Sequence, residues 1–305
     1  MSSTRKKRML QTARKRQSRG KIYLVIVLII IIAGVGLYVY ASSLPPGPPD
    51  FAIAAPIGVT VQAGHQTTAK VNITAVNRFT GTVQLSVTSS NSNLTATISP
   101  ANVTGSGTAT LTLMASTNGS YSVTVSGKSG SLDHSVIPRV ATPVYAILAT
   151  SDGNMTIELY PASAPLTVAN FVKLAKQGFY DNLVWHRIAT SPHVIQTGDP
   201  NTRYGNTSRS TWGLGGSSQT VPLEIDPSLH NNLGCLGMAR SQDLNSGTSQ
   251  FYINIANNNY LDGNYTVFGK VVSSMTPAYQ LANTPVNSSD QPINPVFLTS
   301  VTILD

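Results

Sequence analysis

The sequence predicts a mainly β protein that is preceded by a single membrane-spanning helix. Three observations lead to this prediction. First, residues 22–40 form an apolar run of 19 residues without a charge. Second, most of the later chain consists of short runs that alternate between apolar and polar residues, with turn-forming residues between them. Third, only two short helices are expected after residue 50.

The first 21 residues form a basic tail that we expect to lie in the cytoplasm. Residues 1–21 contain nine lysines and arginines and no acidic residue, whereas the rest of the chain has 11 basic and 12 acidic residues. The formal net charge of +8 therefore belongs to the tail. Basic runs of this kind can bind nucleic acid. The apolar segment that follows favours a membrane-flanking role instead, and we expect no nucleic-acid partner.

Residues 22–40 are predicted to be a transmembrane helix. About 20 apolar residues are needed to cross the hydrocarbon core of a bilayer. Positive charges remain on the cytoplasmic side, so the prediction is a single-pass protein of the cell membrane with extracellular C-terminal domains. The alternative is a cleaved signal peptide, because Val39-Tyr40-Ala41 could serve as a cleavage site. The apolar run is longer than the roughly 7–15 residues usual in signal peptides.

Residues 41–50 contain four prolines and are predicted to be an extended, semi-rigid linker.

Residues 51–139 are predicted to be a small immunoglobulin-like β-sandwich. This segment is rich in Val, Thr, Ser and Asn, and its alternating runs are separated by turn residues about every 8–12 positions. No group of histidines, acids or aromatic residues indicates a site in it. It can therefore be a stalk without a ligand, or an adhesive or peptide-binding module.

Residues 142–305 are predicted to be a second domain. Val144–Leu148 and Thr156–Leu159 indicate two strands joined by a turn. Most of the remaining segment has the pattern of strands and loops. A short helix is expected around Thr276–Ala282.

A longer helix is expected after Pro165. Apolar residues recur at intervals of three and four from Val168 to Ala175, which gives the helix one apolar face. Thr167 is placed to cap its start, and Gly178 is placed to end it.

Five short motifs follow in a fixed order. They are Trp185-His186-Arg187, Gln196-Thr197-Gly198-Asp199, Gly237-Met238-Ala239-Arg240, Ser249-Gln250-Phe251-Tyr252-Ile253 and Leu261–Lys270. With this order and spacing, the segment from about Val144 to Asp305 resembles the cyclophilins, a family that catalyses cis/trans isomerisation of X-Pro bonds. The resemblance implies a closed eight-stranded antiparallel β-barrel with two capping helices and an active groove on its outer face.

The reaction requires a catalyst that favours the twisted amide. Rotation about the peptide bond has a barrier of ~18–20 kcal/mol, and loss of resonance makes the proline nitrogen more basic. A hydrogen-bond donor aimed at this nitrogen, in a pocket that excludes water, would stabilise the twisted state. Arginine suits the task because it stays charged and presents a rigid fork of donors. We expect no cofactor and no metal, since no two of the five histidines have a zinc-type spacing.

The resemblance assigns roles to individual residues. Arg187 corresponds to the catalytic arginine, and Gln196 to the glutamine that orients it and contacts the substrate backbone. Further substrate contacts are expected from Ala239, Arg240, Gln250, Tyr252, Tyr260, Leu261 and Tyr265. Because Tyr260 replaces a tryptophan associated with tight cyclosporin binding, weak inhibition by that drug is expected.

His193 is the main departure from the family pattern. One residue is inserted between Arg187 and Gln196, and alignment from Gln196 places His193 at the floor of the proline pocket, where the family has phenylalanine. Protonation would put a charge in an apolar pocket, so activity would fall as the pH drops through about 6.5. The alternative alignment turns His193 to solvent and leaves Val194 or Ile195 at the floor.

The sequence therefore predicts a membrane-anchored isomerase that acts on Pro-containing segments of secreted or surface proteins and assists their folding. Two alternatives remain: a binding module of low activity that recruits Pro-containing segments, and a purely structural surface protein. Eight Asn-X-Ser/Thr sequons make N-glycans possible outside the cell, although Asn264, beside the expected site, is predicted to be unmodified.

Overall fold

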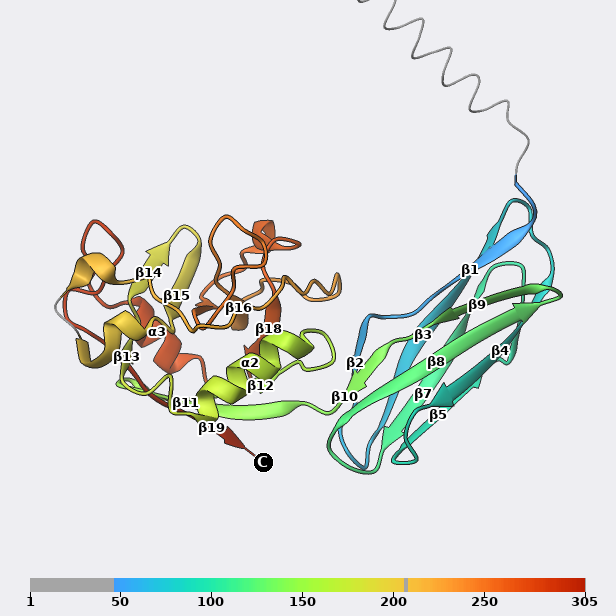
Figure 1. Cartoon of the computed structure of the whole chain (residues 1–305), viewed down its shortest axis with the longest axis horizontal. Coiled ribbons are helices and arrows are strands. Elements are labelled where there is room, and N and C mark those ends of the chain that lie inside the picture. The colour runs from blue at the N-terminus through green and yellow to red at the C-terminus, as the bar shows by residue number, and fades with distance from the viewer. Residues whose placement is uncertain (1–46, 206–207, 305) are drawn as a thin grey trace, which may run out of the picture. The chain divides into compact units, whose positions relative to one another are not determined.

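The structure is a computed structural model that describes residues 47–205 and 208–304. The predicted basic tail and transmembrane helix lie outside the described residues, as does most of the predicted linker. Within the described part of the chain, no helix is long and apolar enough to cross a membrane. The chain is mainly β, and its strands form two groups, β1–β10 before residue 142 and β11–β19 after it (Figure 1).

Strands β1–β10 form two sheets. The first has the order β1-β3-β7-β5, and the second has the order β2-β10-β8-β4-β6, with β9 paired to β8. The strands are β1 (Asp50–Ala54), β2 (Gly58–Thr60), β3 (Gln66–Val76), β4 (Thr82–Ser89), β5 (Leu94–Ser99), β6 (Asn102–Thr104), β7 (Gly107–Ala115), β8 (Ser120–Ser129), β9 (Leu132–Val136) and β10 (Arg139–Ala141). All pairings are antiparallel except that of β2 with β10.

The two sheets share one apolar core. In β7, Leu111 and Leu113 are buried, whereas Thr108 and Thr110 are exposed. This alternation is the consequence of a strand with one face turned to the core. The core includes residues of both sheets, such as Val71, Leu111, Val83 and Val125. The segment is therefore a two-layered β module, and its assignment to the immunoglobulin-like class remains a prediction.

Strands β11–β19 form a closed barrel. The strand order is β13-β19-β11-β12-β18-β16-β17-β15-β14. The strands are β11 (Val144–Thr150), β12 (Gly153–Leu159), β13 (Leu183–Val184), β14 (Arg187–Thr190), β15 (His193–Thr197), β16 (Cys235–Met238), β17 (Phe251–Asn254), β18 (Val267–Val271) and β19 (Phe297–Leu304). Only Trp185 and His186 separate β13 from β14 in the sequence, so the two ends of the order are joined. If β13 and β14 are counted as one interrupted strand, the barrel has the eight strands that were expected.

Two α-helices pack against the barrel core. Helix α2 (Pro165–Lys176) and helix α3 (Thr276–Ala282) lie where they were expected. Phe171 of α2 and Leu281 of α3 are fully buried in the core. Three short 3-10 helices complete the domain: η1 (Pro200–Gly205), η2 (Arg209–Thr211) and η3 (Asn259–Leu261).

The start of α2 differs from the expected capping by Thr167. No side-chain cap is present at the N-cap residue, Ala164. The carboxylate of Glu224 accepts hydrogen bonds from the backbone N–H groups of Leu166 (3.1 Å) and Thr167 (2.8 Å) instead. A carboxylate at this position also interacts favourably with the helix dipole. The cap is therefore supplied from a distant loop.

Candidate active site

A row of side chains crosses three adjacent strands on the outer face of the barrel. Arg187 of β14 is paired with Gln196 of β15, and Gln196 is paired with Tyr252 of β17. Successive side chains of a strand point to opposite faces. The sequence neighbours of the row belong to the barrel core: Ile188, Ile195 and Ile253. Arg187, Gln196 and Tyr252 therefore point outward together.

A pocket of about 230 Å³ opens beside this row, and we call it the Arg187 pocket. It is lined by Arg187, Pro192, Val194, Gln196, Ala239, Arg240, Tyr252, Leu261 and Tyr265. Its base is apolar, because Val194 and Tyr252 form a small buried cluster with Ala189, against which Leu261 and Tyr265 pack. A pocket with apolar walls and a guanidinium at its edge suits a small apolar ring that carries a hydrogen-bond acceptor.

A chain of amides fixes the orientation of Gln196. The Nε2 group of Gln196 donates to Oε1 of Gln250 (2.9 Å). Nε2 of Gln250 in turn donates to the carbonyl oxygens of Gly213 (3.0 Å) and Gly215 (2.6 Å). Nε2 of Gln196 is directed to Gln250, which does not line the Arg187 pocket. The amide oxygen of Gln196 therefore remains to accept a hydrogen bond from a group in the pocket.

The glycine-rich segment that anchors Gln250 also lines a second cavity of about 360 Å³. Its lining residues are Gln196, Gly213, Leu214, Gly215, Gly216, Ser217, Ala239, Arg240, Ser241, Ser246, Thr248 and Gln250. Gln196, Ala239 and Arg240 line both cavities. An extended chain seated in the Arg187 pocket could therefore continue into the second cavity.

Arg240 closes one side of the Arg187 pocket. Its guanidinium carbon lies 4.5 Å from the centre of the Tyr265 ring, which is a cation–π contact. Its Nε group donates to the carbonyl oxygen of Asn264, and Nη1 donates to that of Ser241, both at 2.8 Å. The contacts with Tyr265 and Asn264 join the segment after β16 to the loop before β18, so that Arg240 has a structural role in holding Tyr265.

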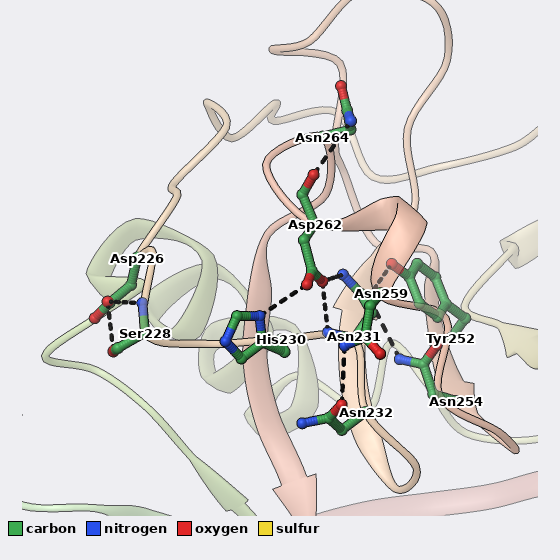
Figure 2. A network of polar contacts seen from close by, with 10 residues as sticks. All are labelled: Asp226, Ser228, His230, Asn231, Asn232, Tyr252, Asn254, Asn259, Asp262 and Asn264. Carbon is green, nitrogen blue, oxygen red and sulfur yellow. Dashed lines mark hydrogen bonds and ion pairs between the residues drawn. The ribbon is translucent and has the colours of Figure 1, made fainter.

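A polar network lies behind Tyr252 (Figure 2). The buried Tyr252 hydroxyl donates to Oδ1 of Asn231 (2.8 Å). The backbone N–H and side-chain amide of Asn231 donate to Oδ1 of Asp262 (2.8 and 3.0 Å). Nδ1 of His230 lies 2.8 Å from the other carboxylate oxygen of Asp262. The network thus links Tyr252 to the residue that follows Leu261, and both Tyr252 and Leu261 line the Arg187 pocket.

Burial and hydrogen bonding set the charges in this network. Burial raises the pKa of Tyr252 well above its ordinary value, so the hydroxyl stays protonated. Burial also acts to raise the pKa of Asp262, but the hydrogen bonds from Asn231 and His230 outweigh it and the pKa is lowered. A neutral hydroxyl and an ionised carboxylate are the forms that match the observed donors and acceptors.

His186 belongs to the first motif but points away from the Arg187 pocket. It is 3% exposed, and burial lowers its pKa to about 4, against the opposing effect of Asp199. The ring is therefore neutral near neutral pH. Within residues 47–205 and 208–304, no group of three or more His, Cys, Asp or Glu side chains could hold a metal ion.

The structure corrects the expected position of His193. Val194 lines the Arg187 pocket, and its neighbour His193 points to the other face of β15. Pro192 also lines the pocket, and His193 does not. Thr190 pairs with His193, which leaves Ser191 and Pro192 as the connection of the hairpin. The register of the hairpin thus supports the alternative in which Val194 lies at the floor.

Tyr260 also lies outside the Arg187 pocket. It belongs to η3 and is 65% exposed. Gln250 acts on the pocket through Gln196 and lines only the second cavity. The other expected residues, Arg187, Gln196, Val194, Ala239, Arg240, Tyr252, Leu261 and Tyr265, all line the pocket.

Three residues near the pocket were not expected from the sequence. Pro192 lines it, Asn231 binds the Tyr252 hydroxyl, and Asp290 lies 3.8 Å from Arg187. None of them belongs to the five motifs. The tyrosine at position 252 was a usable signal for Asn231, because a buried hydroxyl requires a hydrogen-bond partner.

Comparison with known proteins gives a consistent result for the barrel. Residues 145–303 match the family described as cyclophilin type peptidyl-prolyl cis-trans isomerase/CLD. Peptidyl-prolyl cis-trans isomerase-like 1 of Aspergillus niger is 40% identical over 160 residues, which are 51% of this chain and 92% of the relative. A peptidyl-prolyl cis-trans isomerase of Schizosaccharomyces pombe is 39% identical over 158 residues, which are 52% of this chain and 97% of the relative.

A solved structure is also similar to this part of the chain. It is a cyclophilin type peptidyl-prolyl cis-trans isomerase of Cryptosporidium parvum, with 28% identity and a TM-score of 0.48, covering 53% of this chain and 98% of that one. The family match begins in β11, and strands β1–β10 lie outside it.

Proposed function

We infer that this chain, which belongs to the cyclophilin-type peptidyl-prolyl cis-trans isomerases, isomerises X-Pro bonds in the Arg187 pocket. The observation that carries this proposal is the position of the Arg187 guanidinium at the edge of a pocket of about 230 Å³ whose base is apolar. The substrates are Pro-containing polypeptides, and the reaction uses no cofactor.

The pocket residues have separate roles in the proposed mechanism. The proline ring packs against Val194, Tyr252 and Leu261, which removes water from the amide. As the bond twists and the proline nitrogen becomes a better acceptor, Arg187 donates a hydrogen bond to it. Gln196 contacts the substrate backbone through the amide oxygen that its bond to Gln250 leaves in the pocket.

The segment Ala239–Arg240 is proposed to bind the residues on the N-terminal side of the proline. Ala239 lines both cavities, and its N–H donates to the carbonyl oxygen of Gln250 (2.9 Å). Because Ala239 lies between the two cavities, we propose that the substrate runs in an extended conformation from one cavity to the other.

The location of the activity is a separate proposal that rests on the sequence. Residues 22–40 anchor the chain in the cell membrane, and the basic tail remains in the cytoplasm. The β module acts as an immunoglobulin-like stalk, and the isomerase domain assists the folding of secreted or surface proteins. N-glycans on some of the eight sequons are compatible with this location.

A second candidate is a binding module of low activity that recruits Pro-containing segments. The observation that favours it is the floor of the Arg187 pocket, where the aliphatic Val194 takes the place of the family's phenylalanine. Weaker packing of the proline ring would lower the rate and leave binding in place.

Protease-coupled isomerisation of a short X-Pro peptide distinguishes the two candidates. Full-length wild type should accelerate the exchange, and Arg187→Ala should remove most of the acceleration. Binding of the same peptide by wild type without acceleration would support the second candidate and contradict the first.

A further inference from the structure

We propose that Asp290 is a positioning residue that holds the Arg187 guanidinium in its catalytic orientation. This proposal rests on the proposed function. Oδ2 of Asp290 lies 3.8 Å from Nε of Arg187, and the two side chains are 45% and 35% exposed. Asp290 does not line the Arg187 pocket, so it acts on the reaction through its contacts with β14 and not by touching the substrate.

Asp290 contacts the arginine-bearing strand twice. Besides the ion pair, the carbonyl oxygen of Asp290 accepts a hydrogen bond from the backbone N–H of Ile188 (2.8 Å). Strand β14 pairs with β15 on its other side. The main-chain bond therefore sets the position of Asp290 along β14, and the carboxylate meets the side chain of the neighbouring residue.

The loop that carries Asp290 is itself ordered by hydrogen bonds. Oδ1 of Asn287 accepts from the backbone N–H groups of Ser289 (2.9 Å) and Gln291 (3.1 Å), and the carbonyl oxygen of Asn287 accepts from the backbone N–H of Asp290 (3.1 Å). Nε2 of Gln291 donates to the carbonyl oxygen of Arg209 (2.9 Å). Asp290 has a φ of 59°, a left-handed conformation that asparagine and aspartate tolerate better than most residues. The carboxylate of Asp290 is thus carried by a loop that is held in place by its own hydrogen bonds.

The geometry of the ion pair suits a positioning role. The carboxylate faces Nε, which leaves both Nη groups of Arg187 for the pocket. A long, partly exposed arginine side chain samples several rotamers when it has no partner. By favouring one of them, Asp290 increases the fraction of molecules in which the guanidinium faces the substrate.

The first test compares the kinetics of Asp290→Asn with those of wild type, using full-length protein and a short X-Pro peptide. Asparagine keeps the size and tolerates the same φ, so the loop is preserved. An exposed ion pair of this kind corresponds to a factor of roughly two to five. We expect kcat to fall by about this factor with KM unchanged, and Asp290→Glu to restore part of the loss.

Asp152→Asn is the matched control, because it removes an equal charge from the loop between β11 and β12. It should leave kcat unchanged. In an Arg187→Ala background, Asp290→Asn should cause no further loss. An equal loss in both backgrounds, or an unchanged kcat in Asp290→Asn, would overturn the proposal.

A second test does not depend on turnover. In protein labelled with 15N-arginine, the Nε–H signal of Arg187, assigned by its loss in Arg187→Lys, should shift and become more mobile in Asp290→Asn but not in Asp152→Asn. If wild type is inactive and this signal still responds, the proposed function fails while the Asp290–Arg187 contact stands. An Nε–H signal that is the same in wild type and Asp290→Asn would overturn the contact itself.

Discussion

Gly237 and Tyr252 form a pair whose coupling tests the architecture of the Arg187 pocket. The two residues are opposite each other in β16 and β17. A Cβ atom on Gly237 would lie 2.1 Å from Cζ and 2.2 Å from the hydroxyl oxygen of Tyr252. The ring would have to move by about 1.3 Å to reach an ordinary contact of 3.4 Å. The bond of the hydroxyl to Asn231 opposes that movement.

The expected energies follow from this geometry. Gly237→Ala should lower the free energy of unfolding by about 1–3 kcal/mol, the usual cost of overpacking. Tyr252→Phe alone should cost about 1 kcal/mol, since one buried hydrogen bond is lost. In the double variant the phenyl ring is no longer tethered to Asn231 and can move away from the introduced methyl group. The double variant should therefore be more stable than the sum of the single effects predicts, by about 1 kcal/mol or more.

The assay is urea unfolding of the four proteins, combined with kcat/KM for an X-Pro peptide. Displacement of a pocket wall by about 1 Å can cost up to a hundredfold in rate, so Gly237→Ala should lose activity and the double variant should recover part of it. Gly119→Ala is the control, because its Cβ would meet only ordinary contacts from 3.5 Å. Strictly additive stabilities, or a Gly237→Ala variant with wild-type stability and rate, would show that the Tyr252 ring is not confined between Gly237 and Asn231.

Four further predictions follow from the site and the sequence. Arg187→Ala should lower kcat/KM by roughly 10²–10³-fold without changing the circular dichroism spectrum, and Arg187→Lys should recover little, because the fork of donors is lost. His193→Phe should leave kcat/KM nearly unchanged, since His193 does not line the pocket. For the same reason, kcat/KM of the wild type should not change between about pH 5.5 and 8 in the X-Pro peptide assay. The pKa of His186 is about 6.5 in the unfolded chain and about 4 in the folded one. The free energy of unfolding, measured by urea titration, should therefore fall by up to ~3 kcal/mol as the pH drops from about 6.5 to about 4. His186→Phe should make this decrease smaller. Protease added to intact cells should degrade the chain after Ala41, whereas protection of that part would contradict the proposed orientation.

Several features of the fold were predictable because they depend on local patterns. The apolar spacing from Val168 to Ala175 indicated α2, and alternation of apolar and polar residues indicated strands in the first group. In the second group, two strands were predicted individually and the rest only as strand and loop. The motif around Arg187 and the motif around Gln196 identified the family, since family motifs keep their order and spacing along the chain. The prediction for residues 22–40 concerns a segment outside the described residues and stays a prediction.

Other features depended on how distant segments meet. Glu224 caps α2 from a loop, and no local pattern connects the two. Asp290 reaches Arg187 from the segment before β19, although about a hundred residues separate them in the sequence. The position of His193 depended on the register of one hairpin, and a shift of one residue exchanges the two faces of a strand.

The family, the strand-rich composition and the candidate catalytic arginine and glutamine all follow from the sequence alone. These properties are carried by residue types at short, regular separations, which hydrophobic periodicity and motif spacing express directly. Three contacts become apparent only in the folded chain: Val194 rather than His193 meets the pocket, Asn231 binds the Tyr252 hydroxyl, and Asp290 faces Arg187. The first of these contacts depends on the register of one hairpin. The other two join residues that are 21 positions and about a hundred positions apart in the sequence, which no local pattern connects.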